Sequence, residues 1–286
     1  MTMQAQRIAG FASLGLGLGI AASSVLGPLV LRVVRFHASQ TIENQFVGGE
    51  IASLVLAAPG CMAAGALWLR QHRLAPAIAL GPALYAVYTY STVIIGQEYR
   101  QYEGNVEKFF PLYAGLVAGA AAITAYAWSQ LDAHLLPEPS ERLRRALGVG
   151  FGSLGGFFAL VWTAQITAVL RGNPPADYQD APTLFWLIKL LDFGFCIPAL
   201  VATGTGLLRR SQAAIKPAYA LAGFGTCLMA SVAGMAVEMT LKDDPAAEPV
   251  MLAVTIPAAA GLAVATWRLL RSYTRLSATS RQVVRA

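Results

Sequence analysis

Three charged residues stand out inside long apolar runs of the sequence, where a charge is energetically costly. Glu50 lies near the start of one run, and Lys189 and Asp192 lie three positions apart in another. In membrane proteins such residues mark ion or solute paths, proton relays or structural ion pairs. Two carboxylates could bind a cation, a proton or an amine, and a lysine beside them would tune their pKa values. These three residues are therefore the predicted charged centre of a binding site.

Three polar residues in other runs could line the same site. Tyr85 and Tyr88 are three positions apart, which predicts that they share one face of a helix, and Gln165 lies in a later run. Other interpretations stay open, since Gln165 could join two helices and the charges could form an ion-pair cluster or reach the external interface. The predicted substrate-binding residues are Glu50, Lys189, Asp192, Tyr85, Tyr88 and Gln165.

Hydrophobic helices in a membrane must position these residues. Of the 286 residues, 56% are hydrophobic and only 13% are charged, and the mean hydropathy is +0.55. Such a chain has too little polar surface for a soluble globule, so its predicted surroundings are a lipid bilayer. The net charge of +6 does not indicate nucleic-acid binding, because the basic residues are dispersed between the apolar runs.

Eight apolar runs predict an all-α, polytopic bundle of eight transmembrane helices. Each run reaches the roughly 20 residues that a helix needs to cross the hydrocarbon layer. Internal prolines do not exclude helices here, since neighbouring helices can satisfy the freed backbone groups. The runs are 8–34, 47–69, 75–96, 109–131, 147–170, 183–208, 217–241 and 250–270.

The distribution of lysine and arginine predicts the orientation of the chain. If the N-terminus is cytoplasmic, fourteen basic residues fall on the cytoplasmic side and six on the other. The positive-inside rule therefore predicts a plasma (inner) membrane protein with both termini in the cytoplasm and an acidic external face. The first run is longer than the apolar core of a signal peptide, so we expect a retained helix.

The chain aligns with itself at an offset of 139 residues. The second and sixth runs then share the pattern P-x3-A-x-G-x3-L-R, and Glu50 aligns with Lys189. This predicts a parallel repeat of two four-helix halves, 1–139 and 140–286, the second with a basic cytoplasmic tail. Chance alignment of Ala- and Gly-rich helices is the alternative. Glycines four apart in the first and fifth runs predict close contacts, either between these two helices or within each half.

The sequence contains no motif for a metal, a cofactor or a nucleophile. We find no phosphate-binding loop, no H-E-x-x-H, no G-x-S-x-G and no C-x-x-C, and the three cysteines and three histidines lack metal-ligand spacing. No metal site and no cofactor are therefore predicted. Enzymatic activity stays open but is not favoured.

Three functions remain open on the sequence alone. The first is a transporter or permease that binds a small polar or cationic solute in an outward-facing cavity between the two halves. The second is a non-catalytic membrane subunit or sensor that binds a partner protein, a lipid or a second copy of itself. The third is an intramembrane enzyme acting on lipids, with Glu50 or Asp192 as acid or base.

Overall fold

The computed structural model describes residues 3–133 and 136–283, with side chains as far as residue 273, and these residues contain helices and no strands. Eight helical segments among them are long and apolar enough to cross a membrane. The prediction of an all-helical chain with eight such segments is confirmed, and the architecture is compatible with a multi-pass membrane protein. His134 and the side chains of Arg275, Arg281 and Arg285 in the predicted basic tail lie outside the described part.

The first half (residues 3–133) contains four membrane-length segments. The first of them ends in a short π-helix, η1, the second is interrupted by another, η2, and the fourth begins with a 3-10 turn, η3. The elements are α1 (Met3–Ser24), η1 (Val25–Leu29), α2 (Gln40–Ala52), η2 (Ser53–Ala57), α3 (Ala58–Leu69), α4 (Ala75–Ile95), η3 (Val106–Phe109) and α5 (Phe110–Gln130).

The second half (residues 136–283) also contains four membrane-length segments, and α7 is a short helix in the connection between two of them. The π-helix η4 interrupts the sixth segment, and the 3-10 turn η5 begins the seventh. The elements are α6 (Glu141–Leu170), α7 (Ala176–Asp180), α8 (Pro182–Leu191), η4 (Asp192–Cys196), α9 (Ile197–Leu208), η5 (Gln212–Ala214), α10 (Ile215–Leu241) and α11 (Pro249–Val283).

Helices α2 and α6 begin several residues before the apolar runs that predicted them. Ser39 accepts a hydrogen bond of 3.3 Å from the backbone N–H of Ile42, and Ser140 accepts one of 3.4 Å from Leu143. These serines cap the free N–H groups of the first helical turn. Capping lets polar residues form the ends of the helices, so hydropathy alone placed these two boundaries too late.

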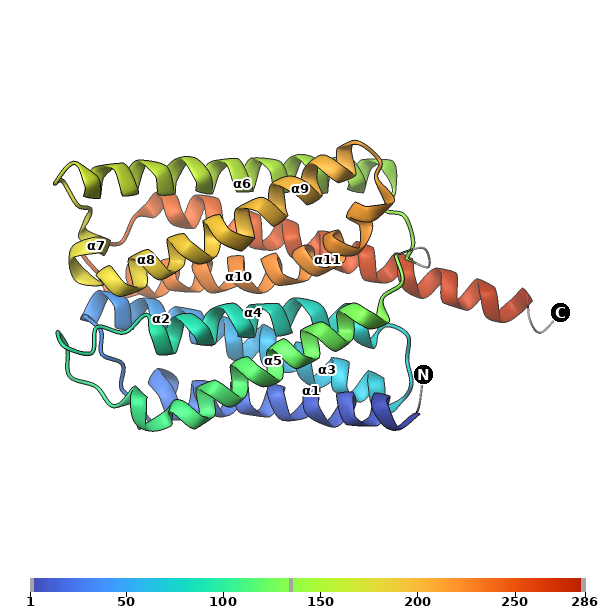
Figure 1. Cartoon of the computed structure of the whole chain (residues 1–286), viewed down its shortest axis with the longest axis horizontal. Coiled ribbons are helices and arrows are strands. Elements are labelled where there is room, and N and C mark those ends of the chain that lie inside the picture. Colours follow the sequence, from blue (N-terminus) through green and yellow to red (C-terminus); the bar gives the residue numbers. More distant parts are fainter. Residues whose placement is uncertain (1–2, 134–135, 284–286) are drawn as a thin grey trace.

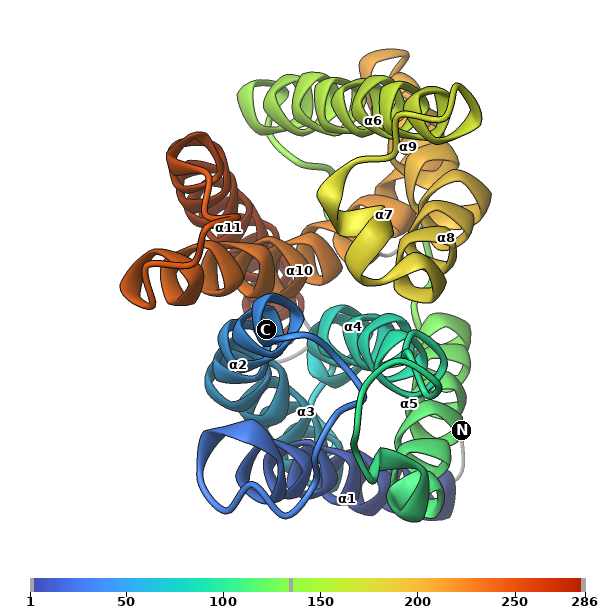
Figure 2. The same ribbon diagram turned by 90° about the vertical axis from the view of Figure 1, so that its left-hand side faces the viewer.

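The first half is a closed four-helix bundle. Helix α1 packs on α3, α3 on α4, α4 on α5 and α5 again on α1, so the four segments surround one interior (Figure 2). Its largest fully buried side chains are aromatic. They are Trp68, Tyr85, Tyr90 and Tyr113.

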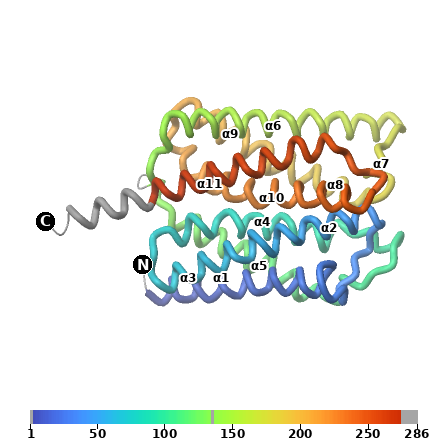
Figure 3. Tube along the Cα trace, turned by 180° about the vertical axis from the view of Figure 1, so that it is seen from behind, coloured from blue at the N-terminus to red at the C-terminus, as the bar shows by residue number. Residues whose placement is uncertain are grey.

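The second half is arranged more openly. Helix α6 packs mainly on α9, whereas α10 packs on α11 and also on α2 and α4 of the first half. Figure 2 shows α6 and α11 as separate arms on the side away from the first half. From behind, α11 runs along α10, and the two chain ends lie at the same end of the bundle (Figures 1 and 3).

Glycines make the closest helix contacts, both between the halves and within them. A Cβ on Gly48 of α2 would lie 2.3 Å from the backbone of Gly234 in α10, so only glycine fits there. Within the halves, α1 approaches α3 at Gly65, and α6 approaches α9 at Gly204. Since α1 and α6 lie on opposite outer sides (Figure 1), the predicted contact between them is wrong. Of the glycines that predicted close contacts, Gly19 and Gly148 pack within their own half, on Leu116 and Leu208, whereas a Cβ on Gly15, Gly152 or Gly156 would meet nothing within 4 Å.

Several local features recur at the offset of 139 residues. The π-helix η4 spans the positions that correspond to η2, one residue for one residue. The residues that follow the ends of α3 and α9 correspond as well: Gln71 and Arg210 both have a positive φ, 54° and 58°. Each of the two membrane-length segments therefore has its π-helix and its end at the same place.

Candidate functional site

The first charged centre surrounds Glu50, in the interior of the first half. The residue is 3% exposed, and its Oε2 accepts a hydrogen bond from Ser24 of α1. Its Oε1 is buried and has no hydrogen-bond partner among the described residues. An ionised carboxylate in such a place is costly unless a positive charge or further donors compensate it.

Three tyrosines, Tyr85, Tyr90 and Tyr113, are fully buried in the same half as Glu50. The hydroxyl of Tyr85 is 2.8 Å from Ser53 Oγ, and the hydroxyl of Tyr113 accepts a bond of 3.4 Å from Ser23. The hydroxyl of Tyr90 is buried without a partner in the described structure. The centre thus combines a carboxylate, several hydroxyls and two unsatisfied oxygen atoms in a closed bundle.

The second charged centre surrounds Asp192, the first residue of η4. Tyr88 of α4 donates a hydrogen bond of 3.0 Å to Oδ1, and the indole N–H of Trp162 in α6 donates one of 2.8 Å to Oδ2. Both carboxylate oxygens are therefore satisfied by neutral donors. The three residues come from three membrane-length segments, so the centre fixes α4 and α6 to the π-helix of the sixth segment.

Lys189 lies beside this centre but does not form an ion pair with Asp192 in the described structure. Its Nζ lies 4.1 Å from the ring centroid of Trp162 and 3.7 Å from that of Phe185. The residue is only 5% exposed. The faces of two aromatic rings thus surround the ammonium group, which is the geometry of a cation–π contact.

The structure brings some of the predicted site residues together and separates others. Lys189, Asp192 and Tyr88 lie in one centre, whereas Glu50 and Tyr85 belong to the other. Tyr85 and Tyr88, which were expected to line one site, are oriented toward different neighbours of α4: one hydroxyl is beside Ser53 and the other donates to Asp192.

Gln165 lies on α6, three residues after Trp162. Its Oε1 is buried and has no partner among the described residues, so the predicted hydrogen bond between helices is not seen for this oxygen. The sequence did not predict the places of Tyr90, Tyr113 and Phe185 in these centres. In the sequence each of them is only an aromatic residue in an apolar run, and such residues more often pack in a hydrophobic core than belong to a site.

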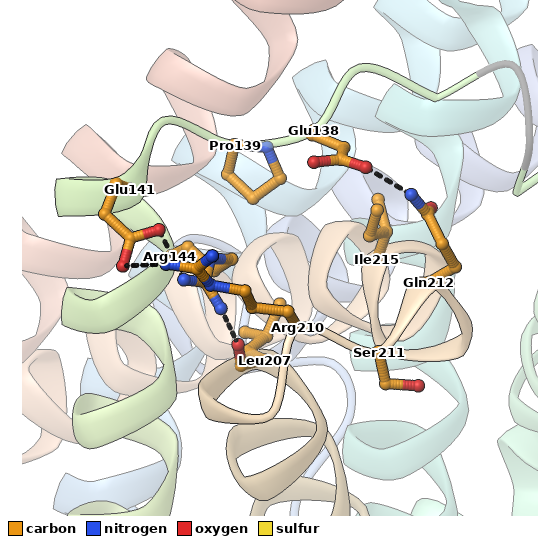
Figure 4. A pocket seen from close by; sticks show the side chains of 9 residues that line it. All are labelled: Glu138, Pro139, Glu141, Arg144, Leu207, Arg210, Ser211, Gln212 and Ile215. Atoms are coloured by element: carbon orange, nitrogen blue, oxygen red, sulfur yellow. Dashed lines mark hydrogen bonds and ion pairs between the residues drawn. The ribbon is translucent and has the colours of Figure 1, made fainter.

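Two hollows open at the ends of the bundle, and neither is lined by Glu50, Lys189 or Asp192. The larger, about 450 Å³, lies among the loops that follow α1 and α4. The other, about 200 Å³, is drawn in Figure 4, where Arg144 donates to Glu141 and, over 2.5 Å, to the backbone oxygen of Leu207. That network ties the start of α6 to the end of α9. The charged centres themselves are enclosed, not open to the outside as predicted.

The connections at the acidic end fasten the two halves together. The backbone N–H of Thr183, at the start of α8, donates a bond of 2.6 Å to Glu98, and Tyr102 donates one of 2.8 Å to Asp180. Ser39 also donates to Asp180. The acidic residues of this end therefore cap helices and bind the opposite half.

Comparisons with family models, curated proteins and solved structures found no match to this chain. The function must therefore be argued from the geometry of the two centres.

Proposed function

We propose that the protein is a multi-pass membrane transporter that moves a small monovalent cation, in the simplest case a proton, through the Glu50 centre. The observation that carries the proposal is the buried Oε1 of Glu50, which has no partner in the described structure. Ionisable residues within a membrane generally have partners and belong to ion paths or proton relays. A proton or a small cation supplies the partner that this oxygen lacks.

The surroundings of Glu50 suit such a cation. The unpartnered hydroxyl of Tyr90 and the hydroxyls of Ser24 and Tyr85 offer further oxygen atoms. Hard cations bind oxygen ligands, and chains of hydroxyls can also relay a proton. The enclosed centre corresponds to a state in which the bound ion is sealed from both sides.

The π-helix η2 provides a way to open the centre. It begins three residues after Glu50, and single π-turns inside α-helices occur frequently at functional sites. Conversion of η2 to α-helix would rotate the preceding turn and carry Glu50 away from Ser24. A second π-helix, η4, begins at Asp192 in the corresponding segment of the second half. This correspondence supports two related halves in a parallel repeat.

The orientation of the transporter follows from its charges. The connections at the end of the bundle where the termini lie are the more basic ones, and those at the opposite end contain most of the acidic residues. We place the basic end and both termini in the cytoplasm of a cell whose plasma membrane holds the protein.

Purified protein in proteoliposomes tests the proposal. With an imposed membrane potential and a dye inside that responds to H⁺, Na⁺ or K⁺ in turn, we expect ion uptake by the wild type and its loss in Glu50→Gln, which keeps the shape and removes the charge. Glu248→Gln, at an exposed position of the acidic end, is the matched control and should leave uptake unchanged. Equal uptake by the Glu50→Gln variant and the wild type, or no uptake of H⁺, Na⁺ or K⁺ by the wild type, would overturn the proposal.

A second function, a non-catalytic membrane subunit, is favoured by the open second half. Helix α6 packs mainly on α9 and exposes large side chains such as Leu160 and Phe157. A partner helix or a second copy of the chain would cover them. Light scattering of protein purified in mild detergent tests this function, since a constant complex larger than one chain supports it and a monomer contradicts it.

A further inference from the structure

We infer that the aromatic and acidic surroundings of Lys189 are a binding site for organic ammonium ions, which Lys189 occupies as a tethered stand-in. The site, here called the ammonium box, consists of Trp162, Phe185, Tyr88 and Asp192. It lies between the second half and α4 of the first half, and it does not depend on ion transport through Glu50.

Two aromatic rings surround the ammonium group of Lys189. The ammonium group of Lys189 lies 3.7 Å and 4.1 Å from the ring centroids of Phe185 and Trp162. Aromatic rings around a cation are the usual means of recognising alkylated ammonium ions, whose charge is spread over carbon and cannot be satisfied by hydrogen bonds alone. Neighbouring rings support the box, since Phe158 stacks on Trp162 with a centroid distance of 5.6 Å.

A buried carboxylate, that of Asp192, lies beside these rings. Asp192 is 8% exposed and is held by Tyr88 and Trp162 at 3.0 Å and 2.8 Å. These neutral donors orient the carboxylate without cancelling its charge, so the box has a fixed negative group beside its rings. Trp162 does both tasks, because its N–H faces Asp192 while its ring face contacts the ammonium group.

The head group of Lys189 can be replaced by a free ammonium ion. It makes no ion pair with Asp192 in the described structure, and both oxygens of Asp192 already have donors. A free ammonium ion that takes the place of the lysine head group would therefore break no hydrogen bond to the carboxylate. The long, flexible lysine side chain can withdraw, which makes it a competitor tethered to the site.

The lysine side chain that links the ammonium group to the backbone sets the expected gain in affinity when this group is removed. A group held by a short flexible chain competes with an effective concentration on the order of millimolar or higher. Removing the lysine head group should therefore strengthen the apparent affinity for an organic ammonium ion by about tenfold or more. The gain requires that the rings and the carboxylate stay in place.

Titration of the full-length protein in detergent with tetramethylammonium chloride, against sodium chloride at equal ionic strength, tests the inference. Tryptophan fluorescence and the unfolding temperature report binding. We expect saturable binding by Lys189→Met at least about tenfold tighter than by the wild type. Adding Trp162→Leu or Asp192→Asn to Lys189→Met should abolish it. Trp267→Leu, at an exposed position of α11, is the matched control and should change nothing.

A second measurement uses the wild type and does not require a stable variant. Tetramethylammonium that displaces Lys189 should increase the acetylation of this lysine by an amine-reactive ester, as measured by mass spectrometry, relative to sodium chloride. The inference is overturned if Lys189→Met shows no saturable response to tetramethylammonium, if its binding survives Trp162→Leu, or if acetylation of the wild type does not change. None of these readouts involves ion flux, so failure here is distinguishable from failure of the Glu50 proposal.

Discussion

The hydroxyl of Tyr88 donates a hydrogen bond of 3.0 Å to Asp192 and thereby joins the third membrane segment of the first half to the sixth segment in the second half. Three residues earlier on the same helix, Tyr85 is 2.8 Å from Ser53 in the Glu50 centre. Helix α4 therefore stands between the two charged centres. A rotation of α4 would change both sets of hydrogen bonds together, which gives the protein a physical connection between its halves.

Removal of the Tyr88 hydroxyl should weaken this connection. A hydrogen bond to a charged group contributes about 1.5–3 kcal/mol, so Tyr88→Phe should lower the free energy of unfolding by roughly that amount. Equilibrium unfolding in mixed detergent micelles measures it.

Tyr126→Phe is the matched control for Tyr88→Phe. The hydroxyl of Tyr126 is buried without a partner in the described structure, so its removal should be neutral or slightly stabilising. A loss in the control as large as that in Tyr88→Phe would contradict the role given to the bond with Asp192.

The contact between Gly48 and Gly234 should be essential for joining the halves. A Cβ at position 48 would lie 2.3 Å from the backbone of Gly234, so Gly48→Ala must push α2 away from α10. Overpacking of this kind typically costs about 1–3 kcal/mol. Gly115→Ala, whose Cβ would meet nothing within 4 Å, should stay within about 0.5 kcal/mol of the wild type.

The yield of monodisperse protein and its unfolding temperature measure both glycine variants. We expect a clear loss for Gly48→Ala and none for Gly115→Ala. Equal behaviour of the two would show that the α2–α10 contact can relax, and that other contacts hold the halves together.

The eight helices were predictable because length and hydropathy suffice to identify a membrane span. The boundaries were less predictable, since Ser39 and Ser140 cap helices that begin in polar sequence. Open packing of the second half was not foreseen at all. Two segments with equal hydropathy can face lipid or protein, and only the three-dimensional arrangement distinguishes α6 from α3.

The three charged residues of the apolar runs are buried in the structure, but they lie in two centres and not in one. The sequence offset placed Glu50 and Lys189 at equivalent positions along the chain, which says nothing of the direction in which each side chain points. Tyr85 and Tyr88 show the same limit. They are three positions apart on one helix, yet the helices that pack around α4 place different partners beside them.

Asp244 should make the stability of the acidic end depend on pH. It accepts hydrogen bonds from Asn44 at 2.8 Å and Thr41 at 3.1 Å. Burial alone would raise the pKa of Asp244, but these bonds and one from the backbone of Ala246 outweigh it and hold the pKa below its usual range. Ionised Asp244 therefore stabilises the folded state fully above the ordinary aspartate pKa of about 4. This stabilisation is lost as the pH falls through the lower pKa that Asp244 has in the folded state.

Asp244→Asn removes this titration. The variant should be less stable than the wild type at neutral pH, and the difference between the two unfolding temperatures should shrink as the pH falls below about 4. Asp243→Asn, at the neighbouring exposed position, should behave as the wild type. A constant difference across this range would mean that Asp244 does not titrate as described.

The orientation of the chain can be tested with cysteines at the two ends of the bundle. Glu103→Cys lies at an exposed position of the acidic end and Ser211→Cys at an exposed position of the basic end, whereas Cys61 and Cys227 are buried. If the basic end is cytoplasmic, as the positive-inside rule predicts, a membrane-impermeant maleimide added to intact cells should label Glu103→Cys only. Permeabilised cells should show labelling of both variants, and the unmutated protein reports the background from Cys196.

Labelling of Ser211→Cys alone in intact cells would invert the topology. The acidic connections that hold α8 and α2 together would then face the cytoplasm, and an ion leaving the Glu50 centre would have to cross the basic end to reach the outside.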